Sequence, residues 1–257
     1  MSVTVKTVRD FLEDRVPSAL KLDYDNVGLL CGRAGREVRK VLVALDFTPE
    51  VINEAADIGA ELIVSHHPLF FDLKRVNDED PTGAKILALA ERGIAAICLH
   101  TNLDAVSGGV NDALAAALGA AVAGPLDAAN PITRLTKLPE QMLFSSFLPF
   151  VKEALKANGL RYHDAGRAVQ NLAVCGGSGA GDLPLAVAAG CDTFVTADVK
   201  HHQFLLAKEY GINLIDAGHF STENVVVPVL AGWLKAQFPE LDIRMTSALM
   251  QPEQFYM

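Results

Sequence analysis

The sequence predicts an α/β protein with mostly parallel sheets. Short apolar runs rich in β-branched residues alternate along the chain with segments of helical spacing. These runs are apolar throughout instead of alternating with polar residues, which is typical of strands covered by helices on both faces. With 257 residues, the chain can form one large domain or two smaller lobes with ample core.

The first half of the chain predicts three strands, each followed by a helix. The strands share β-branched apolar side chains and cover residues 40–46, 62–65 and 94–99. A helix should begin after the first strand, where Thr48 can cap it and Pro49 suits its first turn. The other two helices end before a glycine and cover residues 82–92 and 109–118.

The same alternation returns near the end of the sequence. The expected strands are residues 172–175, 193–196 and 212–215, and the expected helices are residues 182–189, 199–209 and 222–237. The region between the two halves is richer in proline, with an expected strand at residues 142–147 and an expected helix at residues 151–157. We therefore expect two lobes, the first made of residues 1–124 and 195–257 and the second of residues 125–194.

Charge and hydropathy narrow the function classes. The net charge is −9 and the pI is about 5.2, which disfavours a nonspecific nucleic-acid binder because such proteins need a basic face. No apolar run reaches the roughly 18 residues that span a bilayer, and the first residues lack the apolar stretch of a signal peptide. We expect a soluble, cytoplasmic protein with reduced cysteines.

Histidines concentrate at the ends of the expected strands. Six of the seven histidines follow a strand closely, and His163 is the exception. The polar residues at these four strand ends are His66 and His67; His100, Asn102 and Asp104; Asp198, His201 and His202; and Asp216, His219 and Glu223. Because ligands of parallel α/β sheets bind beyond the carboxyl ends of the strands, these residues predict a functional site.

The residue types at these ends predict metal chemistry. Imidazole and carboxylate ligands suit Zn, Fe, Mn, Co or Ni, and no thiolate cluster is evident. His66 and His67 should point in different directions, since side chains alternate along a strand. Such a pair can serve two neighbouring ions, and a carboxylate can bridge them in a hydrolytic arrangement. We expect two divalent metal ions of an identity that these ligands do not fix.

Some of these residues keep two readings. His100 either lines the site or has a structural role, and Asp198, His201 and His202 either contact substrate and move protons or form a solvated helix start. Gly176 to Gly179 either cradle a phosphate or make a tight turn. His219 is expected in a loop, with Ser221 as the cap of the helix that carries Glu223.

Five segments resemble the signature segments of the GTP cyclohydrolase I type 2 family, the NIF-three-like dinuclear metal proteins. They occur in family order as residues 25–29 (DNVGL), 65–69 (SHHPL), 100–104 (HTNLD), 196–202 (TADVKHH) and 216–223 (DAGHFSTE). Ala197 stands where the family often has glycine. The resemblance extends from about residue 7 to residue 250.

The resemblance implies a fold, an assembly and a ligand set. The fold would have two interlinked α/β lobes, and the assembly would be a ring-shaped homohexamer. Some relatives carry an extra inserted domain, for which this chain is too short. The metal ligands implied by the matching positions are His66, His67, Asp104, His219 and Glu223. Glu223 is the expected bridging carboxylate, with Asp104 as the alternative.

Two classes of function follow from the residues and the resemblance. The first is a metal-dependent hydrolase of a small nucleotide-like substrate, in which His100, Asp198 and His201 are the candidate catalytic residues. The family name implies opening of the GTP ring, although no residue identifies guanine. The second is a non-catalytic metal-binding protein with a regulatory or metal-chaperone role. An enzyme must keep an open or water-filled metal position, and this feature distinguishes the two.

Overall fold

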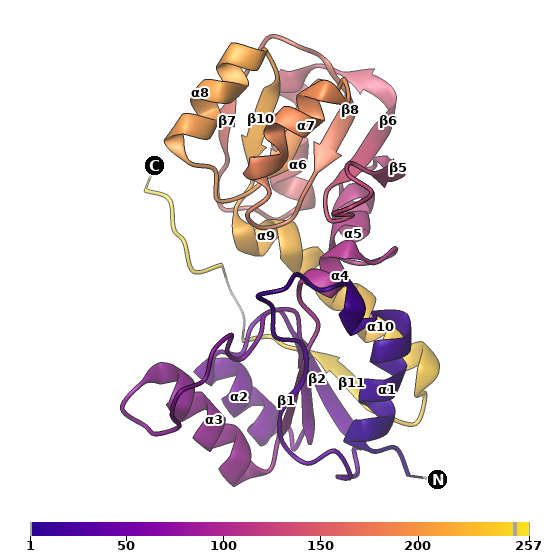
Figure 1. Ribbon diagram of the computed structural model, residues 1–257, viewed down its shortest axis with the longest axis vertical. Coiled ribbons are helices and arrows are strands. Elements are labelled where there is room, and N and C mark those ends of the chain that lie inside the picture. The colour runs from indigo at the N-terminus through magenta and orange to yellow at the C-terminus, as the bar shows by residue number, and fades with distance from the viewer. Residues whose placement is uncertain (1, 249–250, 257) are drawn as a thin grey trace. The chain divides into compact units, whose positions relative to one another are not determined.

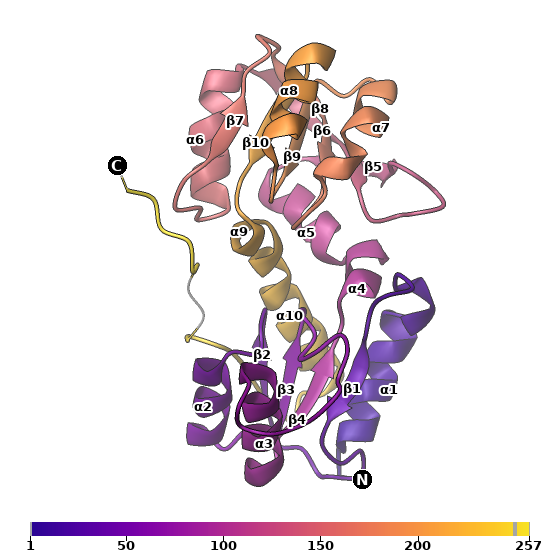
Figure 2. The ribbon, with the colours of Figure 1, turned by 60° about the vertical axis from the view of Figure 1, so that its left-hand side comes forward.

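The computed structural model describes residues 2–248 and 251–256, which form two compact units (Figures 1 and 2). Unit 1 contains Met1–Leu103 and Val227–Met250, and unit 2 contains Asp104–Val226 and Gln251–Met257. The boundaries differ from the expected second lobe of residues 125–194. Unit 2 extends beyond residue 194 because the strands of residues 193–196 and 213–216 pair into its sheet.

The sheet of unit 1 is mostly parallel, as predicted. Its strand order is β1-β4-β3-β2-β11, and its strands are β1 (Gly28–Cys31), β2 (Lys40–Ala44), β3 (Leu62–Ser65), β4 (Ala95–Cys98) and β11 (Asp242–Met245). The strands from β11 to β4 are parallel, and β1 pairs antiparallel at the edge. The carboxyl ends of β3 and β4 therefore lie side by side.

Helices cover both faces of this sheet. They are α1 (Val5–Arg15), α2 (Pro49–Asp57), α3 (Pro81–Arg92) and α10 (Val227–Gln237), with the short η1 (Ser18–Leu20) after α1. In Figure 1, α2 and α3 lie on one side and α1 and α10 on the other. Leu42, Ile63 and Ala96 face the α2–α3 side, where they pack with Ile52 and Leu89.

The predicted ends of the unit 1 helices are confirmed. The Thr48 side chain caps α2, and Pro49 is its first residue. Gly93 follows α3 with φ 63°, a left-handed conformation that glycine adopts without steric cost. Asp80 caps α3 by accepting hydrogen bonds from the amides of Thr82 and Gly83.

The sheet of unit 2 is mixed. Its order is β5-β6-β8-β9-β10-β7, and its strands are β5 (Ala121–Pro125), β6 (Arg134–Met142), β7 (Arg161–His163), β8 (Val169–Val174), β9 (Thr193–Thr196) and β10 (Asn213–Asp216). The predicted β8, β9 and β10 are parallel, whereas β5, β6 and β7 pair antiparallel. The predicted α/β class thus holds in both units.

Alternating side chains of β8 pack against helices on the two faces of this sheet. Leu172 and Val174 pack against α5 (Val110–Ala117) and α6 (Phe144–Ala154). Ala173 points to the opposite face, where α7 (Leu183–Ala188) and α8 (His201–Tyr210) lie, as Figure 2 shows for α6 and α7. The short helices α4 (Thr101–Ala105), η2 (Ala180–Asp182), α9 (His219–Glu223) and η3 (Asn224–Val226) complete the described elements.

Three local predictions are wrong. The expected strand at residues 142–147 is the start of helix α6, because Phe144, Phe147 and Val151 recur at helical spacing and are buried on one face. The expected helix of residues 222–237 is interrupted, since α9 and η3 precede α10. His219 is the first residue of α9 rather than a loop residue, and Gly218 takes the cap position expected for Ser221.

No helix within the described residues is long and apolar enough to span a bilayer.

Candidate metal centre

Three histidines meet at the carboxyl ends of two neighbouring strands of unit 1. His66 and His67 follow β3, and His100 follows β4. The His66 ring centroid lies 4.9 Å from that of His67 and 5.2 Å from that of His100. One ring nitrogen of each lies within 4.8 Å of the others. The parallel pairing of β3 and β4 places these side chains together, as the sequence predicts.

Hydrogen bonds fix the orientation of His66 and His67. Nδ1 of His66 lies 3.0 Å from the Leu99 carbonyl oxygen, and Nδ1 of His67 lies 2.6 Å from Oδ1 of Asp46. Because a carbonyl oxygen only accepts, Nδ1 of His66 carries the proton, and an ionised Asp46 imposes the same tautomer on His67. Each ring then offers the lone pair of Nε2, which is the arrangement of a metal-binding histidine.

The third histidine is held by a buried carboxylate. Nδ1 of His100 lies 2.8 Å from Oδ1 of Asp25, and Oδ2 of Asp25 accepts hydrogen bonds from the amide and hydroxyl of Thr101. Burial alone would raise the pKa of Asp25, but the hydrogen bonds from His100 and Thr101 outweigh it and hold the pKa well below its usual range. Asp25 is therefore ionised and fixes the His100 tautomer.

Unit 2 presents a histidine between two carboxylates. Nε2 of His219 lies 2.9 Å from Oε2 of Glu223 one helical turn later, and its Nδ1 lies 2.8 Å from Oδ2 of Asp198. Burial alone would lower the pKa of His219, but the hydrogen bonds to Glu223 and Asp198 raise it to about 9. Asp198 reaches this position from a left-handed backbone conformation with φ 52°.

A second carboxylate accompanies Glu223 within unit 2. An oxygen of Asp104 lies within 4.8 Å of an oxygen of Glu223, and both residues are buried. Asp104 belongs to helix α4, more than a hundred residues before Glu223 in the sequence. Two buried carboxylates this close repel each other when ionised, and a cation would relieve that repulsion.

The glycine-rich turn after β8 supports Glu223. Gly177 has φ 59°, and a Cβ there would lie 2.2 Å from Oε1 of Glu223, so only glycine leaves room for the carboxylate. The amides of the turn donate to side chains of the same unit: Gly176 to Asn111, Gly177 to Thr222 and Gly179 to Thr196. Of the two readings of this segment, the tight turn agrees with these hydrogen bonds.

The remaining strand-end candidates lie elsewhere. His201 and His202 are exposed at the start of α8, and among the described residues neither belongs to a group that could hold a metal ion. Asp216 serves the backbone, because its Oδ2 accepts from the Val199 amide and pairs with Arg161. These positions are near the ends of strands without joining either cluster.

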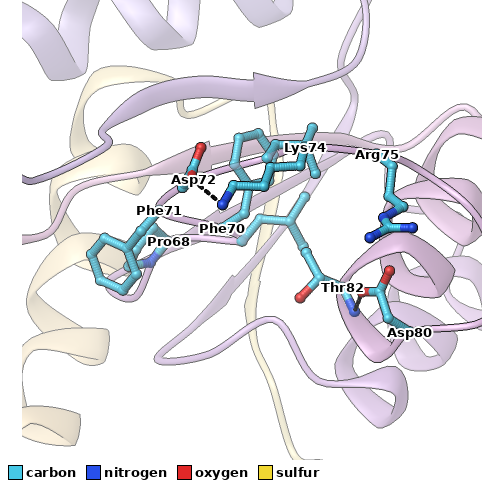
Figure 3. Close-up of a pocket in the computed structure, with 10 residues that line it drawn as sticks. Pro68, Phe70, Phe71, Asp72, Lys74, Arg75, Asp80 and Thr82 are labelled. Atoms are coloured by element: carbon cyan, nitrogen blue, oxygen red, sulfur yellow. Dashed lines mark hydrogen bonds and ion pairs between the residues drawn. The ribbon is translucent and has the colours of Figure 1, made fainter.

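A cavity of about 570 Å³ in unit 1 begins at Pro68, the residue that follows His67. The loop between β3 and α3 forms it, as Figure 3 shows, and the lining is Pro68, Leu69, Phe70, Phe71, Asp72, Leu73, Lys74, Arg75, Asp80 and Thr82. The Phe71 ring centroid lies 5.6 Å from that of His100. Lys74 points toward Asp72 at 3.8 Å, and Arg75 lies on the side of Asp80 and Thr82. The cavity thus combines apolar surface with two cations and the two carboxylates of Asp72 and Asp80.

Sequence reasoning missed the supporting role of two aspartates. Asp46 is the last residue of the expected strand 40–46, and Asp25 begins the first of the segments that resemble the family. An acid directly after β2, which neighbours β3 in the sheet, was a usable signal for Asp46. Asp25 lies 75 residues from its partner His100, and the sequence gives no pairing over that distance.

The donor set fits divalent metal ions. Imidazole nitrogens with fixed tautomers and buried carboxylate oxygens are the ligands that Zn, Fe, Mn, Co and Ni accept. The anchors on Nδ1 are the supporting interactions that metal-binding histidines require. Within the described residues, the groups that could hold an ion contain only His66, His67, Asp104 and Glu223 with His100 and His219. The described cysteines form no disulfide with one another and belong to none of these groups.

Two curated proteins of the same name are similar to this chain over most of its length. The chain is 36% identical over 221 residues to a GTP cyclohydrolase 1 type 2 homolog of Clostridium perfringens, covering 83% of this chain and 84% of that protein. It is 34% identical over 251 residues to the Clostridium acetobutylicum protein of the same name, covering 95% and 94%.

A solved structure and a family model also match, and each covers nearly all of the chain. A Staphylococcus aureus hypothetical protein matches with a TM-score of 0.91 and 29% identity, covering 100% of both chains. The model of the family described as Duf34/NIF3 (NGG1p interacting factor 3) matches residues 3–253. The predicted resemblance is thereby confirmed, and the chain belongs to the Duf34/NIF3 family.

Proposed function

We propose that the protein binds two divalent metal ions and uses them to hydrolyse a small nucleotide-like substrate. The proposed ligands are His66 and His67 from unit 1 and Asp104, His219 and Glu223 from unit 2. Glu223 is the proposed bridging carboxylate, with Asp104 as the alternative. Bound ions of this kind supply Lewis acidity and lower the pKa of water at neutral pH.

The fixed tautomers of the unit 1 histidines carry this proposal. Free surface histidines rotate and exchange tautomers, whereas His66 and His67 each have Nδ1 bound to an oxygen acceptor. Ordering both rings before any ligand arrives lowers the entropic cost of metal binding. An arrangement that only stabilised the fold would not require two adjacent rings to offer Nε2 in the same region.

Two further residues have proposed roles at the reacting centre. His100 has its Nδ1 proton committed to Asp25, so its Nε2 is the position that would accept a proton from a nucleophile. Asp198 accepts from Nδ1 of His219 and would orient that ring. We assign no step to His201, because it is exposed on α8.

The substrate class rests on the relatives and on the cavity of unit 1. Two relatives bear the name GTP cyclohydrolase 1 type 2 homolog, and a volume of about 570 Å³ falls within the range of small-molecule sites. Phe71 offers a ring for an aromatic base. Lys74, which pairs with Asp72, and Arg75, which shares the cavity with Asp80, offer charges for phosphate. We propose a small molecule as partner, rather than nucleic acid, because the net charge is −9.

A second candidate function is a non-catalytic metal-binding protein with a regulatory or metal-chaperone role. The observation that favours it is the proximity of His100 to His66 and His67, within 4.8 Å. A third histidine ligand would fill a position that a hydrolytic centre keeps open for water. Turnover, rather than metal content, separates the two functions.

The test is an assay of the protein purified with its native metal. We expect two equivalents of metal and hydrolysis within a panel of GTP, other nucleotides and generic phosphoesters, with both lost in Glu223→Ala. Glu209→Ala, an exposed glutamate of α8 in the same unit, is the matched control. Two bound equivalents without turnover of any compound would overturn the hydrolase and support the second candidate.

We also propose that the protein is a cytoplasmic homohexamer, as the family resemblance implies. Support from this chain is limited to exposed apolar side chains such as Tyr24 and Phe71, which are 66% and 53% exposed, since large exposed apolar groups mark interaction surfaces. Light scattering of the purified protein measures the assembly directly, and a monomer at micromolar concentration would contradict the hexamer.

A further inference from the structure

The 251–256 segment lies on unit 2 beside the helix that carries His219 and Glu223. Oε1 of Gln251 accepts a hydrogen bond from the Asn158 amide at 3.1 Å, and the Ser221 hydroxyl donates to the same oxygen at 3.4 Å. The Asn158 side chain donates to the Glu253 carbonyl at 3.0 Å. Gln251 thereby joins helix α9 to the turn that follows α6.

Two glycines leave the room that this segment occupies. A Cβ at Gly159 would lie 2.8 Å from the Phe255 ring, and a Cβ at Gly218 would lie 2.9 Å from Nε2 of Gln251. Gly218 also caps α9 with φ 84°. The 251–256 segment and its seat are therefore complementary in shape as well as in hydrogen bonding.

Helix α9 needs support from outside itself. It has five residues, His219–Glu223, and η3 follows it directly. So short a helix depends on contacts with its surroundings, because helix nucleation is costly. Its residues include His, Phe, Ser and Thr, which are mediocre helix formers. The Gly177 amide donates to the Thr222 hydroxyl. In addition, Oε1 of Gln251 accepts a hydrogen bond from the Ser221 hydroxyl.

The same segment borders a cavity that reaches the candidate ligand. This cavity has a volume of about 240 Å³, and its lining includes Asp198, His219, Gln251 and Phe255. His219 and its partner Asp198 thus line the same cavity as residues of the 251–256 segment. Movement of the segment would change the surroundings of the His219 ring.

We propose that Gln251 is a positioning residue of the metal centre, which holds α9 in place for metal binding by His219 and Glu223. The inference rests on the metal centre proposed above. Gln251 contributes no metal ligand, and it acts through Ser221 and Gly218, the neighbours of the ligands. A ligand pair on a loosened helix spends part of its binding free energy on ordering that helix.

Hydrogen exchange of the metal-free full-length protein tests the positioning role without any metal. In Gln251→Ala we expect faster exchange at the Thr222 amide, which donates to the Gly218 carbonyl at 3.1 Å. Tyr256→Ala, at an exposed side chain of the same segment, is the control and should exchange like the parent protein. Unchanged exchange in Gln251→Ala would overturn the proposal.

Titration with Co²⁺, followed by visible absorption and chelator competition, tests the consequence for metal binding. We expect Gln251→Ala to weaken the binding of both Co²⁺ equivalents by about 10–100-fold, as loss of supporting contacts does, because Glu223 is the proposed bridge between the two ions. Gln251→Glu keeps the acceptor oxygen and should recover most of the affinity, and Phe255→Ala offers a second way to unseat the segment.

The outcomes separate the two proposals. Faster exchange with parental Co²⁺ affinity in Gln251→Ala would overturn the role in metal binding. A parent protein that binds no Co²⁺ would instead refute the proposed function, together with the metal-binding part of this inference, and the exchange data would still decide whether Gln251 holds α9.

Discussion

Units 1 and 2 prepare their candidate ligands in different ways. In unit 1, the Nδ1 atoms of His66, His67 and His100 hydrogen-bond to Leu99, Asp46 and Asp25 respectively. This cluster is therefore rich in imidazole, and hydrogen bonds at Nδ1 fix the orientation of its rings. In unit 2, His219 lies between the carboxylates of Asp198 and Glu223, so the site is rich in negative charge. In the proposed metal centre, unit 1 would therefore supply imidazoles of fixed orientation, and unit 2 would supply the anionic ligands.

The largest expected effect comes from removing one proposed ligand in each unit. His66→Ala and Glu223→Ala should each weaken metal binding by more than about 100-fold, or about 2.7 kcal/mol, because both units supply ligands to the same pair of ions in the proposed centre. Metal analysis of the dialysed proteins measures this. His163→Ala, at a half-buried histidine outside both clusters, is the control.

The pattern of loss in these variants also tests the division of labour. If Glu223→Ala retained all metal while His66→Ala lost it, the histidine cluster of unit 1 would be a complete site by itself. If both variants retained all their metal, neither His66 nor Glu223 would be a metal ligand, and the proposed centre would be wrong.

A methyl group at Gly177 tests the carboxylate side of the comparison. Gly177→Ala and Gly119→Ala both place alanine at a left-handed position, which costs about 1–2 kcal/mol. Only Gly177→Ala also displaces Glu223, since no atom lies within 4 Å of a Cβ at Gly119. We expect a further loss of about 1–3 kcal/mol in the free energy of unfolding, measured with urea, and weaker metal binding in this variant alone. Equal losses would show that Glu223 moves aside without cost.

Removal of an anchoring carboxylate tests the imidazole side. Asp46→Ala frees Nδ1 of His67, and we expect metal affinity to fall by about 10–100-fold, or about 1.4–2.7 kcal/mol. Asp72→Ala, at an exposed aspartate whose side chain is 77% accessible, is the matched control. Parental affinity in Asp46→Ala would mean that His67 needs no orientation by its neighbour.

The sequence predicted what depends on contiguous residues. The run Leu62–Ser65 forms β3 as expected, and His66 and His67 follow it, because a continuous apolar run specifies both a buried strand and where it ends. The prediction of a strand at residues 142–147 was wrong because a short apolar run alone does not distinguish a strand from a helix. An apolar run of that length suits a strand or a buried helix, and only the spacing of Phe144, Phe147 and Val151 over the longer segment favours α6.

The sequence allowed us to predict which residues cluster at the strand ends, but not which residues hydrogen-bond to the histidines and orient them. The parallel order of β3 and β4 brings His66 near His100, as strand-end reasoning expects. The pairs Asp46–His67 and Asp25–His100 span 21 and 75 residues, so they depend on tertiary structure. The placement of His219 within α9 depends on Gly218, whose positive φ lets the helix begin one turn early.

The smallest expected effect concerns Asp25 and depends on pH. Its pKa is depressed in the folded protein, so the ionised form contributes stability that is present above the unfolded pKa of about 3.9 and is lost as pH falls through the lower folded value. We expect Asp25→Asn to lower the free energy of unfolding by about 1–2 kcal/mol at pH 7, because His100 and Thr101 lose a charged acceptor. Urea denaturation should show this difference shrinking as the pH falls below about 4. A difference that stayed constant down to pH 3 would mean that Asp25 acts through packing, and the rigid orientation of His100 in unit 1 would then need another source.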